Sequence, residues 1–440
     1  MKEKIRIGCG AGFSGDRLEP ALILAEYGNL DYLVLECLAE RTISLAQKRK
    51  KNDPNLGYDP LLERRIKGLL PFLIKNRIRL ITNMGAANPK AGAQKIIEIA
   101  KSLNIPVKVA VVEGDDVFEK LTGNEFTLES GKLLEEYGDL VSANAYLGID
   151  AIIPALKTDA NIIITGRVAD PSLFLAPLAY EFGWDINEPN LMGQGTMIGH
   201  LMECAGQITG GYFADPVSKP VPNMDTLGHP FVDVEANGNA TISKVSGTGG
   251  LISSQTAKEQ LLYEVIDPHA YLTPDVVADF SKVKIQEIGI DKISISGGLG
   301  KQAPDSLKVS VGYNAGYLGE GEISYAGANA KERAFLAGEI IEKRIGKLYD
   351  EFRIDYIGLS SLHGMELSKD SSPYEIRVRA VGKTFDKTLA NLVGEEVEAL
   401  YTNGPAGGGG ARKNTQELMG VVSILMDRKK INPILTILES

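Results

Sequence analysis

Short apolar runs alternate with amphipathic stretches over the first 180 residues of this chain. The apolar runs predict strands at 4–9, 31–36, 78–83, 107–113 and 161–165. The amphipathic stretches predict helices at 16–27, 40–50, 60–75, 91–104 and 139–157. Strands that alternate with helices in this way form a parallel sheet that the helices cover. The pattern therefore predicts an α/β fold for this part of the chain.

The full length of 440 residues exceeds what one hydrophobic core usually organises, so we expect two domains. We place the boundary near residue 225, after a stretch rich in Gly and Pro. Residues 1–225 are then a Rossmann-like, mostly parallel sheet with flanking helices. Residues 226–440 predict an α+β domain, with short strands and with helices at 254–264, 329–346, 384–401 and 414–427.

Bulk composition excludes several classes of protein. The net charge of −10, without a basic stripe, argues against nucleic-acid binding. The three cysteines form no CxxC pair, which argues against a zinc ribbon or a disulfide framework. No run of 18 apolar residues and no signal-like start occurs, so we expect neither membrane insertion nor secretion. We expect a cytoplasmic protein.

Polar residues follow the predicted strands of the first half. They include Glu36, Asn83, and Arg167 with Asp170. Ligands of parallel sheets bind outside the carboxyl ends of the strands, so this series favours one shared cleft. The alternative is that these ends are polar only because they meet water.

The first strand runs into Gly10-Ala-Gly-Phe-Ser-Gly15, which has the G-x-G-x-x-G spacing of a dinucleotide-binding turn. Gly12, Ser14 and Asp16 are candidate ligand contacts there. Asp16 and Glu19, however, place carboxylates where a helix start should receive a pyrophosphate. The turn therefore predicts either a site for another ligand or a purely structural turn, with an NAD(P) site as an alternative.

A second glycine-rich segment, 193–211, contains His200, Glu203 and Cys204 at helical spacing. His200 and Cys204 on one helix face can hold a metal, but no second local pair of ligands accompanies them, so we predict no metal site. His200 is instead a candidate catalytic or substrate-contacting residue, with a buried structural histidine as the alternative.

The third glycine cluster, 404–410, precedes a predicted helix. Gly408, Gly409, Gly410 and Arg412 combine free backbone amides with a cation, which favours binding of a phosphate or carboxylate. A flexible connector is the alternative.

Eight longer motifs give the chain a resemblance to a known family. They are GCGAGFSGDR (8–17), YLVLECLAER (32–41), TNMGAANP (82–89), TGRVADP (165–171), GHLMECAG (199–206), YLTPDVVADF (271–280), GEGEISYA (319–326) and YTNGPAGGGGARK (401–413). Together they span nearly the whole chain, which resembles the acyclic terpene utilisation AtuA family.

The resemblance implies an enzyme of acyl or acyl-CoA catabolism acting on a branched hydroxyacyl-type substrate, such as a CoA thioester, by hydration, dehydration or carbon–carbon cleavage. We expect the ligand in an interdomain cleft, with Glu36, Asp170 or His200 moving protons and Asn83 polarising a carbonyl. Arg167, Arg412 and the glycine-loop amides would hold an anionic group. No cofactor is identified.

Two other functions remain open. One is an NAD(P)-dependent oxidoreductase that uses the Gly10–Gly15 turn. The other is a non-catalytic binding subunit that acts with a separate small AtuA-like protein, because longer relatives carry a small further domain. We expect a homo-oligomer.

Overall fold

A computed structural model describes residues 2–440. The chain forms two compact units. The first unit comprises two segments, the chain up to Gly312 and Val421–Ser440, and the second unit is Tyr313–Gly420. The expected boundary near residue 225 lies inside the first unit, because the strand that follows it pairs along the first strand of the chain.

The first unit is built on a ten-stranded mixed sheet in the order β11-β12-β8-β7-β1-β2-β3-β6-β4-β18. Its strands are β1 (Lys4–Ala11), β2 (Tyr32–Leu35), β3 (Arg79–Thr82), β4 (Lys108–Glu113), β6 (Ile162–Thr165), β7 (Pro230–Glu235), β8 (Ala240–Lys244), β11 (Lys284–Gly289), β12 (Lys292–Ser296) and β18 (Ile434–Glu439). The strands β1, β2, β3, β6 and β4 are mutually parallel, and every other pairing is antiparallel. The mixed α/β class is therefore confirmed.

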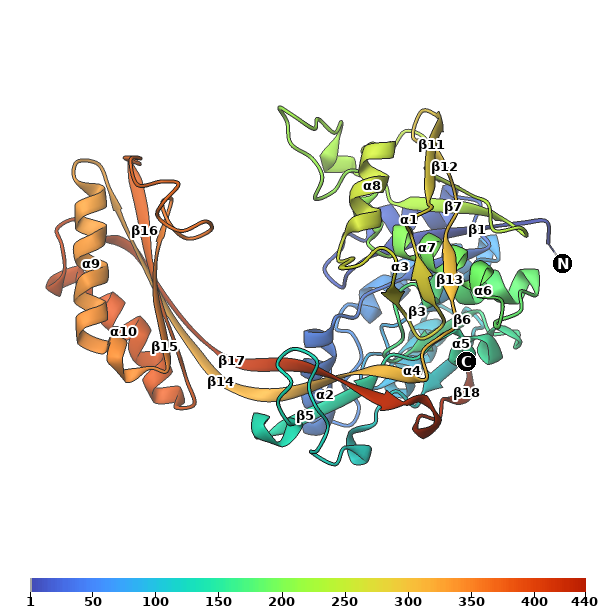
Figure 1. Ribbon diagram of the computed structural model, residues 1–440, viewed down its shortest axis with the longest axis horizontal. Helices are drawn as coiled ribbons and strands as arrows, with labels where there is room; N and C mark the ends of the chain where they lie inside the picture. Colours follow the sequence, from blue (N-terminus) through green and yellow to red (C-terminus); the bar gives the residue numbers. More distant parts are fainter. Residues whose placement is uncertain (1) are drawn as a thin grey trace. The chain divides into compact units, whose positions relative to one another are not determined.

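Helices cover both faces of the parallel strands (Figure 1). The helices of the first unit are α1 (Glu19–Tyr27), α2 (Glu40–Asn52), α3 (Leu62–Asn76), α4 (Pro89–Ser102), α5 (Ile149–Leu156), α6 (Ser172–Phe182), α7 (Pro189–Glu203) and α8 (Ser254–Leu262), of which α2 contacts β5 (Leu140–Ala145) and α8 contacts α7 and β11. The connections from β1 through β4 advance across the sheet in one direction, and the connection from β4 to β6 returns. Since such crossovers are right-handed, α1, α3 and α4 share one face and α5 lies on the other.

The core on the first face follows the two-residue period of the strands. Leu33 and Leu35 of β2 pack there with Leu24 of α1, Leu69 of α3 and Ile96 of α4, and all five are fully buried. The fine boundaries of several helices were predicted well, although α1 begins at Glu19 and not at residue 16.

The neighbouring strands β3 and β6 lead to helices on opposite faces, α4 and α6. At such a point the connections diverge and leave a crevice outside the carboxyl ends of the strands. The polar strand ends that follow β2, β3, β4 and β6 surround this point.

Two predicted helices are wrong. Residues 139–157 form the strand β5 (Leu140–Ala145) before α5 starts, and β5 pairs with β14 (Ser306–Ala326). Residues 414–427 lie within a long strand, β17 (Gly409–Asp427). In β17 the buried residues Val422, Ile424 and Met426 recur every second position, which is the period of a strand.

The first unit also contains a small three-stranded sheet in the order β13-β10-β9. Its strands are β9 (Tyr271–Leu272), β10 (Val277–Asp279) and β13 (Leu299–Lys301). The sheet contacts α7, whose residues are almost all buried.

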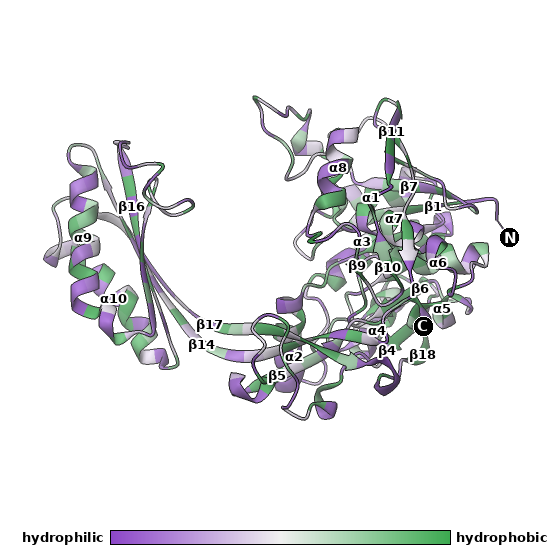
Figure 2. Ribbon diagram, in the orientation of Figure 1, coloured by the Kyte–Doolittle hydropathy of each residue, from purple (hydrophilic) through white to green (hydrophobic). Residues whose placement is uncertain are grey.

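The second unit follows the order β14, α9 (Ala330–Ile345), β15 (Glu351–Ile357), β16 (Glu375–Thr384), α10 (Lys387–Asn403) and β17. Its strands are ordered β15-β16-β14-β17, and the pairings of β16 are antiparallel. This is the split βαβ arrangement of an α+β sandwich. Both helices carry apolar and polar residues (Figure 2). Their apolar faces pack on the sheet through Ala337, Ile341 and Val397.

No helix among residues 2–440 has both the length and the apolar composition needed to cross a membrane.

Candidate functional site

The ends of β2 and β3 are joined by a buried hydrogen-bond network. The Asn83 amide nitrogen donates to Glu36 Oε1 at 2.9 Å, and Asn83 Oδ1 accepts from the backbone N–H of Cys37 at 2.7 Å. Glu36 Oε1 also accepts from the backbone N–H of Leu38 at 2.9 Å. One N–H of the Asn83 amide and its oxygen are thus engaged within the protein, and the residue is fully buried.

Burial raises the pKa of Glu36 well above its ordinary value. The negative charge of Asp170 raises the pKa of Glu36 further, and Arg167 and the hydrogen bond from Asn83 only partly oppose this. The neutral form of Glu36 is therefore favoured more than in an exposed glutamate.

Arg167, after β6, is the cation of the site, and only 1% of it is exposed. Its Nε donates to the carbonyl of Val168 at 2.8 Å, Nη1 donates to the carbonyl of Leu38, and Nη2 pairs with the Asp170 carboxylate. The guanidinium carbon lies 4.5 Å from the centre of the Tyr146 ring. Glu36 accepts a hydrogen bond from the N–H of Leu38, and Arg167 donates one to the carbonyl of Leu38. Glu36, together with Asn83, therefore helps to position Arg167 through the backbone of Leu38.

Asp115, two residues after β4, holds the backbone of Arg167. Its Oδ2 accepts from the N–H of Arg167 at 2.9 Å and from the amide of Asn144 at 2.8 Å. Burial raises the pKa of Asp115 to about 6. The strand ends of β2, β3, β4 and β6 thus form one connected network, and its cation is Arg167.

A cavity of 860 Å³ opens beside this network. Residues of the first unit line it, among them Glu40, Tyr146, Arg167, Asp170, Glu264 and Tyr271. The volume lies within the range of small-molecule sites. Asp170 has 34% of its side chain exposed, so its carboxylate is accessible from the cavity while it stays paired with Arg167.

Glu40 forms a second polar cluster on the cavity wall. One of its carboxylate oxygens accepts from the Tyr146 hydroxyl at 2.9 Å and from Lys308 Nζ at 2.5 Å. Lys308 lies 5.2 Å from the centre of the Tyr146 ring. The Tyr146 ring therefore contacts two cations, Arg167 and Lys308, and its hydroxyl donates a hydrogen bond to Glu40.

His200 lies on α7 and does not line the cavity. Its Nδ1 is 2.9 Å from Glu203 Oε1, and its ring stacks on Phe280 at 5.5 Å. Burial lowers the pKa of His200 to about 4, so the imidazole is neutral. Burial and the charges of Asp170 and Glu264 raise the pKa of Glu203 well above its ordinary value. No three His, Cys, Asp or Glu side chains within residues 2–440 come together as metal ligands.

Two backbone amides of the Gly10–Gly15 turn, those of Gly12 and Phe13, are engaged by the side chain of Asp16. Asp16 Oδ2 accepts from the N–H of Gly12 at 2.6 Å and of Phe13 at 3.2 Å, and the carbonyl of Ser14 accepts from Arg65. A Cβ on Gly12 would lie 2.4 Å from the carbonyl carbon of Cys204. Gly12 therefore serves close packing against the end of α7, and a dinucleotide at this turn would lack two of the amides that should bind the pyrophosphate.

The glycine loop does not precede a helix. Gly408 lies between α10 and β17, Gly409 and Gly410 open the strand, and Arg412 is exposed on it. The predicted helix is wrong, so the anion site loses the helix N-terminus on which it partly depended, and anion binding by these residues stays a prediction. These four residues belong to the second unit.

Sequence reasoning identified Glu36, Asn83, Arg167 and Asp170, which the fold brings together. It missed Glu40, Tyr146 and Lys308, because Tyr146 follows a strand that was predicted as helix and Lys308 lies on β14, far away in the sequence. Glu40 had a signal, since it lies four residues past Glu36 at the start of α2.

Comparisons with known proteins give one strong match. A family model described as acyclic terpene utilisation family protein AtuA matches residues 5–437. No curated protein matches the chain. Among solved structures, the crystal structure of the aspartate kinase of Clostridium acetobutylicum aligns with 90% of this chain and 99% of its own, at 10% identity and a TM-score of 0.18, which is too low to indicate a shared fold.

Proposed function

Because the chain belongs to the acyclic terpene utilisation AtuA family, we propose that it is an enzyme of acyl or acyl-CoA catabolism. Its reaction is hydration, dehydration or carbon–carbon cleavage of a branched hydroxyacyl-type substrate. The observation that carries this proposal is the Arg167–Asp170 pair on the wall of the 860 Å³ cavity at the carboxyl ends of the parallel strands.

Asp170 is the group that takes up a proton in this proposal. It is the carboxylate of the network that reaches the cavity, whereas Glu36 accepts only internal hydrogen bonds. Burial raises the pKa of Asp170, although Arg167 opposes the shift. A carboxylate with a raised pKa is a stronger base toward a hydroxyl or an acidic α-carbon proton.

Arg167 and the cavity tyrosines support that step. Arg167 stays charged and is held rigidly by backbone carbonyls, so it compensates the negative charge of Asp170 until that carboxylate takes up the proton. Burial raises the pKa of Tyr271 well above its ordinary value. The Tyr271 hydroxyl therefore keeps its proton and can donate a hydrogen bond to a substrate oxygen.

The test compares turnover of a branched 3-hydroxyacyl-CoA thioester by the wild type and by Asp170→Asn. We expect kcat/KM to fall by about 10²–10⁴ in the variant, as for loss of a general base. Asp139→Asn, which removes an exposed carboxylate of the same unit, should leave kcat/KM unchanged. In the wild type, kcat/KM should fall as the pH drops through the raised pKa of Asp170.

Full turnover by Asp170→Asn would remove Asp170 from the mechanism. Absence of turnover by the wild type on this class of thioester would contradict the proposed substrate.

A further inference from the structure

The 860 Å³ cavity has an apolar part that the proposed mechanism does not use. Three leucines that line it are each more than half exposed: Leu128 (55%), Leu272 (70%) and Leu425 (53%). They come from three segments of the first unit, namely the segment between β4 and β5, the strand β9 and the end of β17. Single exposed leucines are common on protein surfaces. Three that line one cavity indicate a ligand with an apolar part.

The same cavity is lined by six charged side chains. They are Glu40, Arg41, Arg167, Asp170, Glu264 and Lys308. Lys308 forms an ion pair with Glu40. Arg167 forms an ion pair with Asp170. Two charges of opposite sign therefore remain, those of Glu264 and Arg41.

Glu264 lies on the Asp170 side of the cavity. Its charge acts on Asp170 and on Tyr271, two other residues of the cavity wall. Its carboxylate is also hydrogen-bonded to the side chain of Tyr263. This side of the cavity is therefore acidic and disfavours an anionic ligand group.

Arg41 is a cation of the cavity wall that has no partner. It is the second residue of α2, and its side chain is exposed. Its guanidinium forms no hydrogen bond, ion pair or ring contact with any other of residues 2–440. The preceding carboxylate, Glu40, is already engaged by Lys308 and Tyr146. A free guanidinium can donate two charge-assisted hydrogen bonds to one carboxylate or phosphate.

We propose that the cavity binds an amphiphilic anion. Its apolar chain lies on Leu128, Leu272 and Leu425, and its anionic group is held by Arg41. The anion is a carboxylate if the ligand is a free acid and a phosphate if the ligand is a CoA thioester, and a guanidinium binds both. The proposal rests on the proposed function in one respect, because it takes this cavity as the substrate site.

The experiment measures binding to the full chain by calorimetry. Octanoate and octyl phosphate are the anionic probes, and octanamide is a neutral probe with a chain of the same length. We expect the tighter anion to bind at least about tenfold more tightly than octanamide, because only the anion makes charge-assisted hydrogen bonds to Arg41. Whether octanoate or octyl phosphate binds more tightly identifies the source of the anion.

Chain length tests the apolar part of the proposal. The tighter anion is compared on an eight-carbon and on a six-carbon chain. Each methylene that is half to fully buried on the leucines should raise the affinity by about two- to fourfold. We therefore expect the longer chain to bind about four- to sixteenfold more tightly.

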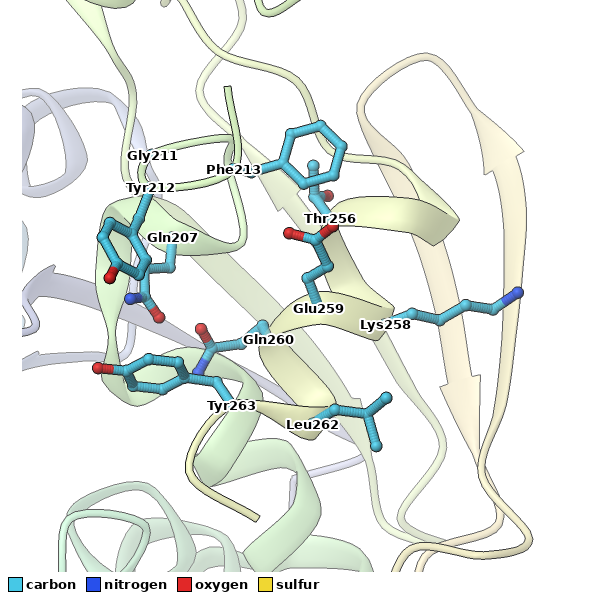
Figure 3. A pocket seen from close by; sticks show the side chains of 10 residues that line it. All are labelled: Gln207, Gly211, Tyr212, Phe213, Thr256, Lys258, Glu259, Gln260, Leu262 and Tyr263. Carbon is cyan, nitrogen blue, oxygen red and sulfur yellow. The ribbon is translucent and has the colours of Figure 1, made fainter. Parts of the chain in front are cut away.

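Two variants separate the two parts. Arg41→Gln should weaken the tighter anion by about tenfold or more and leave octanamide unchanged. Leu272→Ala should reduce the gain in affinity from six to eight carbons. The controls Lys258→Gln and Leu262→Ala remove an exposed cation and a leucine that is 60% exposed, both on α8 beside the separate 340 Å³ cavity (Figure 3), and should change no affinity. Circular dichroism and the melting temperature establish that the variants are folded.

The proposal is overturned if octanamide binds as tightly as both anions, or if folded Arg41→Gln binds the tighter anion as the wild type does. It is also overturned if the six- and eight-carbon anions bind equally, if folded Leu272→Ala keeps the full gain with chain length, or if no probe binds at millimolar concentration. These measurements need no turnover, so their failure is distinct from failure of the Asp170 test.

Discussion

Asp115 makes the stability of the protein depend on pH in a predictable direction. Its pKa is raised from an ordinary 3.8 to about 6, because the buried site disfavours the charged form more than its hydrogen bonds favour it. Each pKa unit corresponds to about 1.4 kcal/mol, so the shift amounts to about 3 kcal/mol. The folded state binds the proton more tightly than the unfolded state. The contribution is therefore fully present below about pH 4 and is lost as the pH rises through about 6.

The perturbation that isolates this contribution is Asp115→Asn, which is neutral at every pH and keeps an oxygen to accept from Arg167. The free energy of unfolding is measured by urea denaturation from pH 4 to pH 7 for both proteins. We expect the difference, wild type minus variant, to fall by about 3 kcal/mol across this range, since other titrating groups cancel.

Asp139→Asn controls for removal of one exposed carboxylate. Asp275 offers an independent repeat, because burial also raises its pKa to about 6. A difference between wild type and Asp115→Asn that stays constant from pH 4 to pH 7 would refute the assignment of a buried, protonatable carboxyl at this strand end.

Two further predictions concern the packing of Gly12 and the hydrogen bonds of Asn83 and Glu36. Gly12→Ala should destabilise the protein by about 1–3 kcal/mol, because the new Cβ would lie 2.4 Å from the backbone of Cys204. Gly409→Ala is the control and should have little effect on the melting temperature, because no atom lies within 4 Å of its new Cβ. Equal melting temperatures for these two variants would contradict the packing role of Gly12. Asn83→Ala should lower the free energy of unfolding by about 1–3 kcal/mol, because it leaves the Cys37 N–H unpaired. Glu36→Gln should lower the free energy of unfolding less, because glutamine keeps an acceptor for the Leu38 N–H. Chemical denaturation checks both, and a larger loss for Glu36→Gln would reverse our account of the network.

The parallel part of the sheet was predictable because its signal is local. Strands such as β4 are continuous apolar runs, and helices such as α4 carry a clear apolar stripe ended by Pro106. The residues that follow these strands were predictable for the same reason, since strand order brings their ends together. Glu36, Asn83, Arg167 and Asp170 were found in this way.

The parts that failed depend on distant partners. Leu418, Val421, Val422 and Leu425 fit a helical stripe, yet Leu425 is 53% exposed and Val422 is buried with Ile424. The neighbouring strand β14, about a hundred residues earlier, decides the strand conformation. The role of Gly12 could not be predicted either, because a glycine is required there by the backbone of Cys204, which follows the end of α7 far away in the sequence.

The chain leaves the first unit within β14 and returns to it within β17, and these two strands are neighbours in one sheet. The second unit is thus an insertion whose entry and exit lie side by side. Such a segment can be gained, lost or exchanged in a single genetic event, because closing the two strands with a short turn restores a continuous chain. The Arg167–Asp170 cavity and the second unit are accordingly free to diverge at different rates among relatives.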